Sequence, residues 1–138
     1  PRLPYLYALT SFWDQAPATL VSYSIHPTTH LLTRAAETST AGFQAAHAAF
    51  HPEGTLLLVA HFLSGDLALF DTAGGALYAA PPRAVVPLPG PFRDAAKHGN
   101  ARYEGPRAHG VAWTPCGTRA VACDAGAASM VWVFALEG

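Results

Sequence analysis

Short apolar runs alternate with turn-forming residues along the whole chain. The runs are rich in β-branched and aromatic residues, and Gly, Pro, Asp and Thr separate them. This pattern is typical of strands joined by tight turns. The best helical candidate, the Ala-rich stretch 40–50, contains Gly42 and ends at His51-Pro52, where a helix stops. The pattern therefore predicts an all-β chain.

A unit of two strands joined by a Pro-x-Gly turn occurs twice, at 46–61 and at 108–124. Pro restricts φ to the value that the corner of such a turn requires, and Gly accepts the positive φ that closes it. The copies align when His47 is placed opposite His109 and Gly54 opposite Gly117, with one residue inserted between the two matches. The alignment predicts that these two histidines are equivalent.

A third strand follows each copy, at 66–71 and at 129–136, and a partial first copy supplies strands at 5–10 and 19–24. Units of this kind at a fixed period predict a β-propeller, whereas the repeats of a solenoid, the alternative, are usually shorter. The chain then divides into about two and a half blades: a partial blade 1–40, a blade 41–92, an inter-blade loop 93–107 and a partial blade 108–138.

The Pro- and Gly-rich link 79–107 joins the two complete copies of the unit. Its first part, 84–88, is predicted to be an outer edge strand. The remainder is a long excursion, and loops of that length are uncommon unless they are functional.

Composition excludes several classes of protein. About half of the 138 residues are hydrophobic (51%) and only 12% are charged, which argues against disorder. The formal net charge of −1 gives no basic field for nucleic acid or an anionic membrane. Apolar runs such as Leu56–Ala60 are far shorter than the roughly 20 residues of a membrane span. Cys116 and Cys123 fit neither a zinc pattern nor CxxC, and reduced thiols in a cytoplasmic protein are expected.

Several motifs follow one another in the order of a known family. Tyr5-Leu6-Tyr7-Ala8 opens like a blade strand, and 47–60 carries a His, a Pro-Glu-Gly turn and an apolar strand. The stretch 105–111, Gly-Pro-Arg-Ala-His-Gly-Val, precedes a second turn at 115–117 and the strand Trp132-Val133-Phe134. This order resembles the lactonase family of seven-bladed β-propellers, which includes 6-phosphogluconolactonases and carboxy-muconate cyclases.

The resemblance implies a fold and an activity. It implies cofactor-independent hydrolysis of a sugar lactone, such as 6-phosphogluconolactone to 6-phosphogluconate. A full member is more than twice as long as this chain, so we expect an incomplete segment of a propeller. Its exposed strand edges are expected to meet either the remaining blades of a parent chain or another copy. The expected ligand is a small-molecule sugar lactone or carboxylated lactone.

Two other functions stay open. A muconate-type lactonising cycloisomerase needs the same kinds of residues on the same fold. A non-catalytic propeller scaffold or a decayed fragment is favoured by departures from the family pattern, which commonly has His at position 107 and Asn at position 61, where this chain has Arg107 and His61. The turns carry Glu53 and Cys116 where the family usually has Asp.

Lactone hydrolysis needs a group that activates water, a donor for the oxyanion and a cation for the substrate's anionic group. The stretch 102–109 supplies all of these residue types. The candidate catalytic residues are His109, Glu104 and His47. The candidate substrate-binding residues are Arg102, Arg107 and His61. The alternative is a solvated loop whose histidines only cap strands or make hydrogen bonds within a blade.

Other polar and aromatic residues are expected to be structural. Asp124, the counterpart of His61, is expected to satisfy backbone N–H groups at a turn. His51 is expected to be a turn residue, and His26, His30 and His98 to lie in surface loops. The aromatic residues of the strands are expected in the core: Phe50, Phe70, Trp113, Trp132 and Phe134.

No cofactor or metal is expected. His47, His51 and His61 would meet at a metal only if the fold happened to bring them together. The sequence also has no Walker or Rossmann glycine loop and no GxSxG motif of a serine hydrolase.

Overall fold

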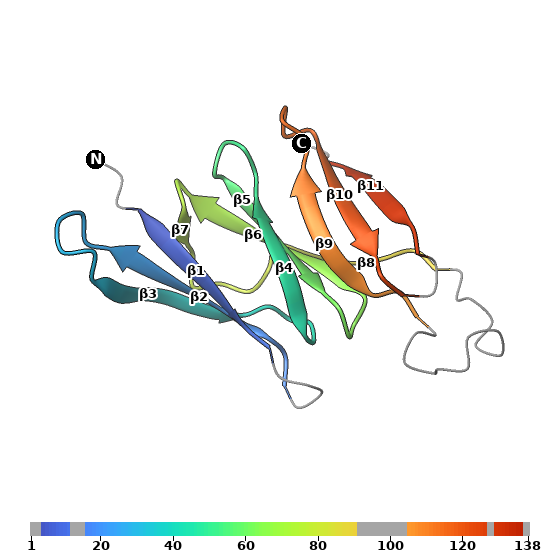
Figure 1. Ribbon diagram of the computed structural model, residues 1–138, viewed down its shortest axis with the longest axis horizontal. Coiled ribbons are helices and arrows are strands. Elements are labelled where there is room, and N and C mark those ends of the chain that lie inside the picture. The colour runs from blue at the N-terminus through green and yellow to red at the C-terminus, as the bar shows by residue number, and fades with distance from the viewer. Residues whose placement is uncertain (1–3, 12–15, 91–104, 127–128, 137–138) are drawn as a thin grey trace.

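The computed structural model describes residues 4–11, 16–90, 105–126 and 129–136. Within these ranges the chain forms three antiparallel sheets that follow one another along the long axis of the molecule (Figure 1). The first sheet contains β1 (Tyr5–Thr10), β2 (Thr19–Ile25) and β3 (Leu32–Ser39). The second contains β4 (Ala45–Phe50), β5 (Leu56–His61), β6 (Asp66–Ala73), β7 (Ala76–Leu77) and β8 (Ala84–Pro87). The third contains β9 (Ala108–Trp113), β10 (Arg119–Asp124) and β11 (Val131–Ala135).

The all-β prediction is confirmed, because the described residues include no helix. Nor does this part of the chain contain a helix long and apolar enough to cross a membrane. The Ala-rich stretch 45–50 pairs with β5 along its length. The expected edge strand at 84–88 is β8, which pairs with β6. Strand β3 was not predicted. Most β3 residues are exposed, so this outer strand lacks the apolar run that identifies the others.

The Pro-x-Gly turns have the predicted geometry. Gly54 and Gly117 have φ angles of 67° and 72°, in the region that an L-residue rarely adopts. Each turn joins an inner strand to the second strand of its sheet. The turns therefore fix the order in which the strands of the second and third sheets pair.

The core is built on β5, whose six residues are all buried. Leu57 and Val59 pack toward the first sheet in a cluster with Leu20 and Phe70. The alternate residues, Leu58 and Ala60, pack toward the third sheet in a second cluster. Burial of one leucine side chain stabilises a fold by about 1.5–3 kcal/mol. A strand that is apolar on both faces therefore holds three sheets together.

The expected core aromatics differ in position. Phe70 is fully buried, and Trp113, Trp132 and Phe134 pack against the second cluster. Phe50 is the exception, because its side chain is 40% exposed. It ends the inner strand of its sheet and meets the Tyr7 ring edge-on, with the ring centroids 4.8 Å apart.

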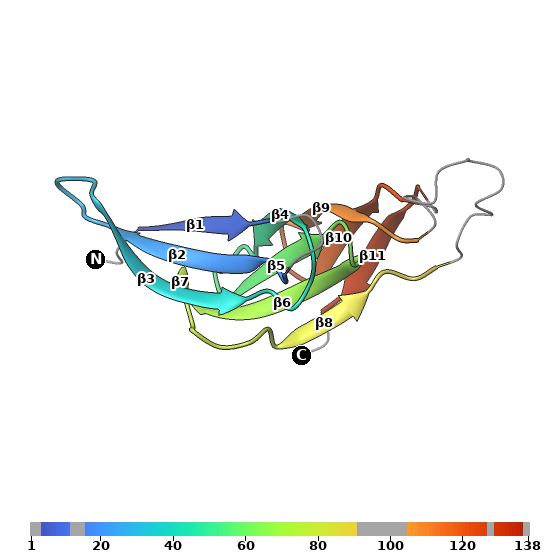
Figure 2. The same cartoon turned by 90° about the horizontal axis from the view of Figure 1, so that it is seen from below.

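The inner strands β4 and β9 lie side by side. The indole Nε1 of Trp113 donates to the carbonyl of Ala49 at 3.1 Å. Figure 2 shows β1, β4 and β9 along one side of the molecule, and β3 and β8 along the other. Each sheet is therefore ordered from an inner strand outward, as in the blades of a propeller.

His51 does more than form a turn. It is buried, and its Nε2 donates to the carbonyl of Gly117 at 3.0 Å, so it ties the β4–β5 turn to the β9–β10 turn of the next sheet. Its ring also meets Trp113 edge-on at 5.0 Å. A Cβ at position 117 would overlap the His51 ring, so Gly117 also permits this close approach.

Candidate active-site rim

The candidate site lies at the end of the strands where the inner strands β4 and β9 begin. Residues 40–47, 61–66, 105–109 and 124 meet there, and together they are called the rim below. The inner strands of the second and third sheets, β4 and β9, each carry a β-bulge at this end. The bulge residue is Ala46 in β4 and His109 in β9. A β-bulge redirects a side chain and is common beside active sites.

The alignment of His47 with His109 is wrong by one residue. In the strand pairing, Phe50 pairs with Leu57 in the second sheet and Trp113 pairs with Ala120 in the third. The number of residues from Phe50 to Trp113 equals the number from Gly54 to Gly117, so no residue is inserted between the two inner strands when they are aligned. His109 therefore corresponds to Ala46, and His47 to Gly110. Because successive side chains of a strand point to opposite faces, a slip of one residue changes what each histidine contacts.

His47 reaches from β4 to the free edge of β9. Its Nδ1 accepts a hydrogen bond from the backbone N–H of Val111 at 3.3 Å, and the residue is exposed. A neutral imidazole that accepts at Nδ1 carries its hydrogen on Nε2. In this arrangement His47 offers a ligand an N–H donor.

His109 is exposed at the bulge of β9. Its ring meets the Phe62 ring edge-on, with the centroids 5.8 Å apart and the planes at 80°. In the described part of the chain its ring nitrogens have no hydrogen-bond partner, which leaves a lone pair for a proton. Histidine is the usual general base near neutral pH.

Arg107 connects the third sheet to the second. Its backbone N–H donates to Oδ1 of Asp124 at 2.7 Å, and its Nη1 donates to the carbonyl of Leu63 at 2.9 Å. Asp124 Oδ1 also accepts from the N–H of Gly126 at 2.7 Å. The expectation that Asp124 satisfies backbone N–H groups is confirmed.

His61 lies beneath the rim with no exposed surface. Its Nδ1 donates to the Asp66 carboxylate at 2.6 Å, and its Nε2 is hydrogen-bonded to the Thr40 hydroxyl at 2.8 Å. Gly42 packs against the ring so closely that a Cβ there would overlap it. The sequence places His61 among the substrate-binding residues, but this burial directs both ring nitrogens to protein partners.

The remaining candidates, Arg102 and Glu104, lie outside the described residues, as does His98. His26 and His30 are exposed, as expected of surface loops. Sequence reasoning missed Thr40, Phe62 and Asp66. Asp66 could have been found from the sequence, because it follows His61 closely across a predicted turn.

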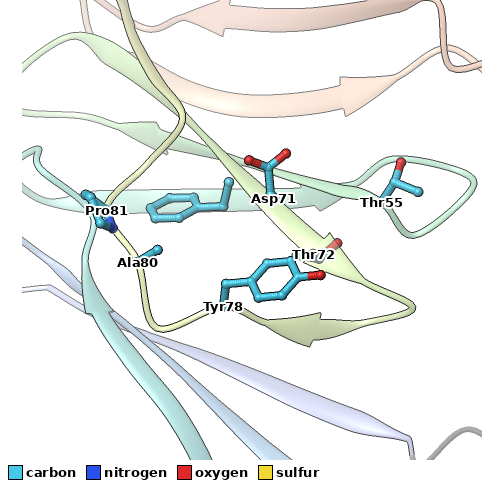
Figure 3. Close-up of a pocket in the computed structure, with 7 residues that line it drawn as sticks. Thr55, Asp71, Thr72, Tyr78, Ala80 and Pro81 are labelled. Atoms are coloured by element: carbon cyan, nitrogen blue, oxygen red, sulfur yellow. The ribbon is translucent and has the colours of Figure 1, made fainter.

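A groove lies elsewhere, at the opposite end of the strands. It has a volume of about 610 Å³ and is lined by Thr55, Phe70, Asp71, Thr72, Tyr78, Ala80 and Pro81. Figure 3 shows Asp71 and Thr72 on β6, Tyr78, Ala80 and Pro81 on the segment that follows β7, and Thr55 just before β5. Since Thr55 precedes β5 and His61 ends it, about 20 Å of strand separates this groove from the rim.

The arrangement at the rim can perform acid–base chemistry. It places an exposed imidazole with an available lone pair on one inner strand and an imidazole N–H donor on the next. A guanidinium lies two residues before His109 along the chain. In general, such groups can activate water, stabilise an oxyanion and attract an anionic substrate.

The three sheets with their inner strands side by side define a segment of a β-propeller. The sequence matches the family described as "Lactonase, 7-bladed beta-propeller" over residues 1–138. The chain therefore belongs to the lactonase family of seven-bladed β-propellers. A search of curated protein sequences found no match.

Three solved structures share the fold. The chain superposes with a TM-score of 0.74 on a protein of Bacteroides fragilis assigned as a 6-phosphogluconolactonase, at 20% identity over 96% of this chain and 35% of that one. The periplasmic gluconolactonase of Pseudomonas aeruginosa gives the same score, at 22% identity over 95% of this chain and 36% of that one. A protein of Bacteroides uniformis, assigned like the first, also gives 0.74, at 22% identity over 96% and 36%. The chain thus spans about a third of the length of these structures.

Proposed function

We propose that the protein containing this segment hydrolyses the ester bond of a sugar lactone. The observation that carries the proposal is the exposed His109 at a β-bulge of β9, with Arg107 two residues before it and the donor His47 on the neighbouring inner strand β4. Membership of the lactonase family supports this reaction class. Structural neighbours named as a 6-phosphogluconolactonase and a gluconolactonase also support it.

His109 is proposed as the general base. It would take a proton from water as the water oxygen bonds to the lactone carbonyl carbon. The Nε2–H of His47 would donate to the oxyanion that develops on the carbonyl oxygen. The bond from that carbon to the ring oxygen then breaks, and the ring oxygen takes from His109 the proton that came from water and leaves as a hydroxyl. The product is the open hydroxy acid.

Arg107 is proposed to attract the anionic group of the substrate, together with Arg102. Glu104 remains an alternative base. A phosphorylated sugar lactone, 6-phosphogluconolactone, is the proposed substrate because a guanidinium recognises phosphate well. The remaining blades of the propeller are proposed to belong to the same parent chain and to cover the free edges of β1 and β11.

Kinetics of single variants test this assignment. His109→Ala is expected to lower kcat by at least about 100-fold, within the usual contribution of general acid–base catalysis. Arg107→Gln is expected to raise KM for 6-phosphogluconolactone more than KM for gluconolactone. The exposed His30 and Arg34 give matched controls, and His30→Ala and Arg34→Gln should leave both constants unchanged. Unaltered kinetics in His109→Ala would exclude His109 as the base.

A further inference from the structure

The turn between β5 and β6, residues 62–65, touches both rim groups of the third sheet. Phe62 packs edge-on against the His109 ring at 5.8 Å. The carbonyl of the next residue, Leu63, accepts the hydrogen bond from Arg107 Nη1 at 2.9 Å. The turn belongs to the second sheet, whereas the residues that it contacts lie at the start of the third, His109 in β9 and Arg107 just before it. Its position therefore bears on the geometry between two sheets.

The turn itself is held at both ends. His61 and Asp66 flank it, and their side chains meet across it at 2.6 Å between Nδ1 and Oδ1. The Gly65 N–H donates to the His61 carbonyl at 3.1 Å. The other ring nitrogen of His61 is bonded to Thr40, so the ring is fixed on both sides. His61 is fully buried and Asp66 is partly buried, which favours a single arrangement because an unpaired polar group of His61 would be costly there.

The turn also lies close to the backbone that leads to Arg107. A Cβ at position 65 would overlap the carbonyl oxygen of Pro106, so Gly65 permits this close approach. On its inner side the turn is bonded to the chain before β4, since the N–H of Phe62 donates to the Gln44 carbonyl at 2.8 Å. Any shift of the turn would therefore be passed to residues 106 and 107.

We infer that the β5–β6 turn is a platform that positions His109 and Arg107, and that His61, Asp66 and Phe62 are positioning residues. Phe62 acts on His109 alone. The His61–Asp66 pair acts on both rim groups, because it fixes the whole turn. The inference deepens the proposed function and rests on it for any effect on catalysis, whereas the effect on the His109 ring does not depend on it.

Asp66 and Phe62 give separable tests. Asp66→Ala removes the acceptor of His61 Nδ1, whereas Asp66→Asn keeps a side-chain carbonyl that can accept the same hydrogen. Phe62→Leu keeps an apolar side chain but removes the ring. Glu37→Gln, on an exposed carboxylate of β3 that is paired with Arg34, and Phe50→Leu are the matched controls.

The first readout is the imidazole spectrum of His109 in ¹H–¹⁵N NMR, assigned with His109→Ala. Asp66→Ala and Phe62→Leu are expected to shift the His109 signals, because the ring of Phe62 moves or is lost. Asp66→Asn and both controls are expected to leave them in place. His109 signals that do not move in Asp66→Ala and Phe62→Leu, in folded protein, would overturn the inference whether or not the protein is a lactonase.

The second readout is the kinetics of lactone hydrolysis. Phe62→Leu is expected to lower kcat by about 10-fold or more with little change in KM, because a displacement of about 1 Å can cost about 100-fold. Asp66→Ala is expected to lower kcat and raise KM together, and Asp66→Asn to restore both. Shifted His109 signals in a protein without lactonase activity would overturn the proposed function and leave the platform standing. Equal effects of Asp66→Ala and Asp66→Asn on both readouts would contradict the role of the hydrogen bond.

Discussion

Gly42→Ala probes how tightly the His61 ring is held. A Cβ at position 42 would lie 2.6 Å from Cε1 of His61, whereas carbon atoms in contact are about 3.5–4.0 Å apart. The ring must therefore move by about 1 Å to restore that contact distance. That movement breaks its hydrogen bonds to Asp66 and Thr40, now 2.6 and 2.8 Å long.

The expected cost follows from these two bonds. Each contributes a net of about 0.5–1.5 kcal/mol, and a buried polar group left without a partner costs about 1–3 kcal/mol. We expect Gly42→Ala to lower the free energy of unfolding by about 2–4 kcal/mol. In a His61→Ala background the added methyl group has room. The same substitution should then change stability by less than about 0.5 kcal/mol, or raise it slightly through the unfolded state.

Urea unfolding followed by tryptophan fluorescence measures all four members of this double-mutant cycle. The expected coupling energy between positions 42 and 61 is about 2–4 kcal/mol, because almost the whole cost of Gly42→Ala should disappear in the His61→Ala background. Equal costs of Gly42→Ala in the two backgrounds would refute the reasoning, because the ring would then not be what excludes the methyl group.

Three further outcomes are expected. Hydrogen bonds with the Thr114 and Thr118 hydroxyls lower the pKa of Cys116 from 9.0 to about 7. In a Cys123→Ser background, the rate of alkylation by iodoacetamide should therefore rise with pH and reach half of its maximum near pH 7. Thr118→Val should move this midpoint to higher pH. The Tyr7 hydroxyl is buried without a partner among the described residues, so Tyr7→Phe should stabilise the fold by about 1 kcal/mol in urea unfolding, and a loss of stability would show a missed partner. β1 and β11 each have an edge that no other described strand pairs, and Val131 and Val133 are 61% and 60% exposed. Light scattering of the 138-residue chain alone should therefore show self-association as its concentration rises. A monomer at every concentration would contradict this prediction.

Local signals in the sequence predicted much of the fold. The turn Gly54 and Gly117 were predictable because Pro-x-Gly combines a fixed φ with a residue that tolerates positive φ. The apolar strand β5 was predictable because a strand that is buried on both faces needs a continuous run of apolar residues, here Leu56–Ala60. The outer strand β3 was not, because an edge strand that faces solvent needs no apolar pattern.

The site was harder to predict, for physical reasons. A β-bulge adds one residue to a strand without a composition signal, so the alignment of His47 with His109 was off by one. The partners of His61 depend on the fold: Thr40 lies 21 residues away and reaches the ring only because the first sheet packs against the second. A solvent-exposed and a buried histidine look the same in a sequence, which is why His61 was placed among the ligand-binding residues.

The measurement that tests the central claim most directly is the rate of 6-phosphogluconolactone hydrolysis by the longest chain that contains these residues. A coupled 6-phosphogluconate dehydrogenase assay follows the product above the fast spontaneous hydrolysis. We expect a rate well above that background, which is lost in His109→Ala. A rate equal to the background, from protein shown to be folded and monomeric, would contradict the proposal of a lactonase and favour a cycloisomerase or a non-catalytic propeller.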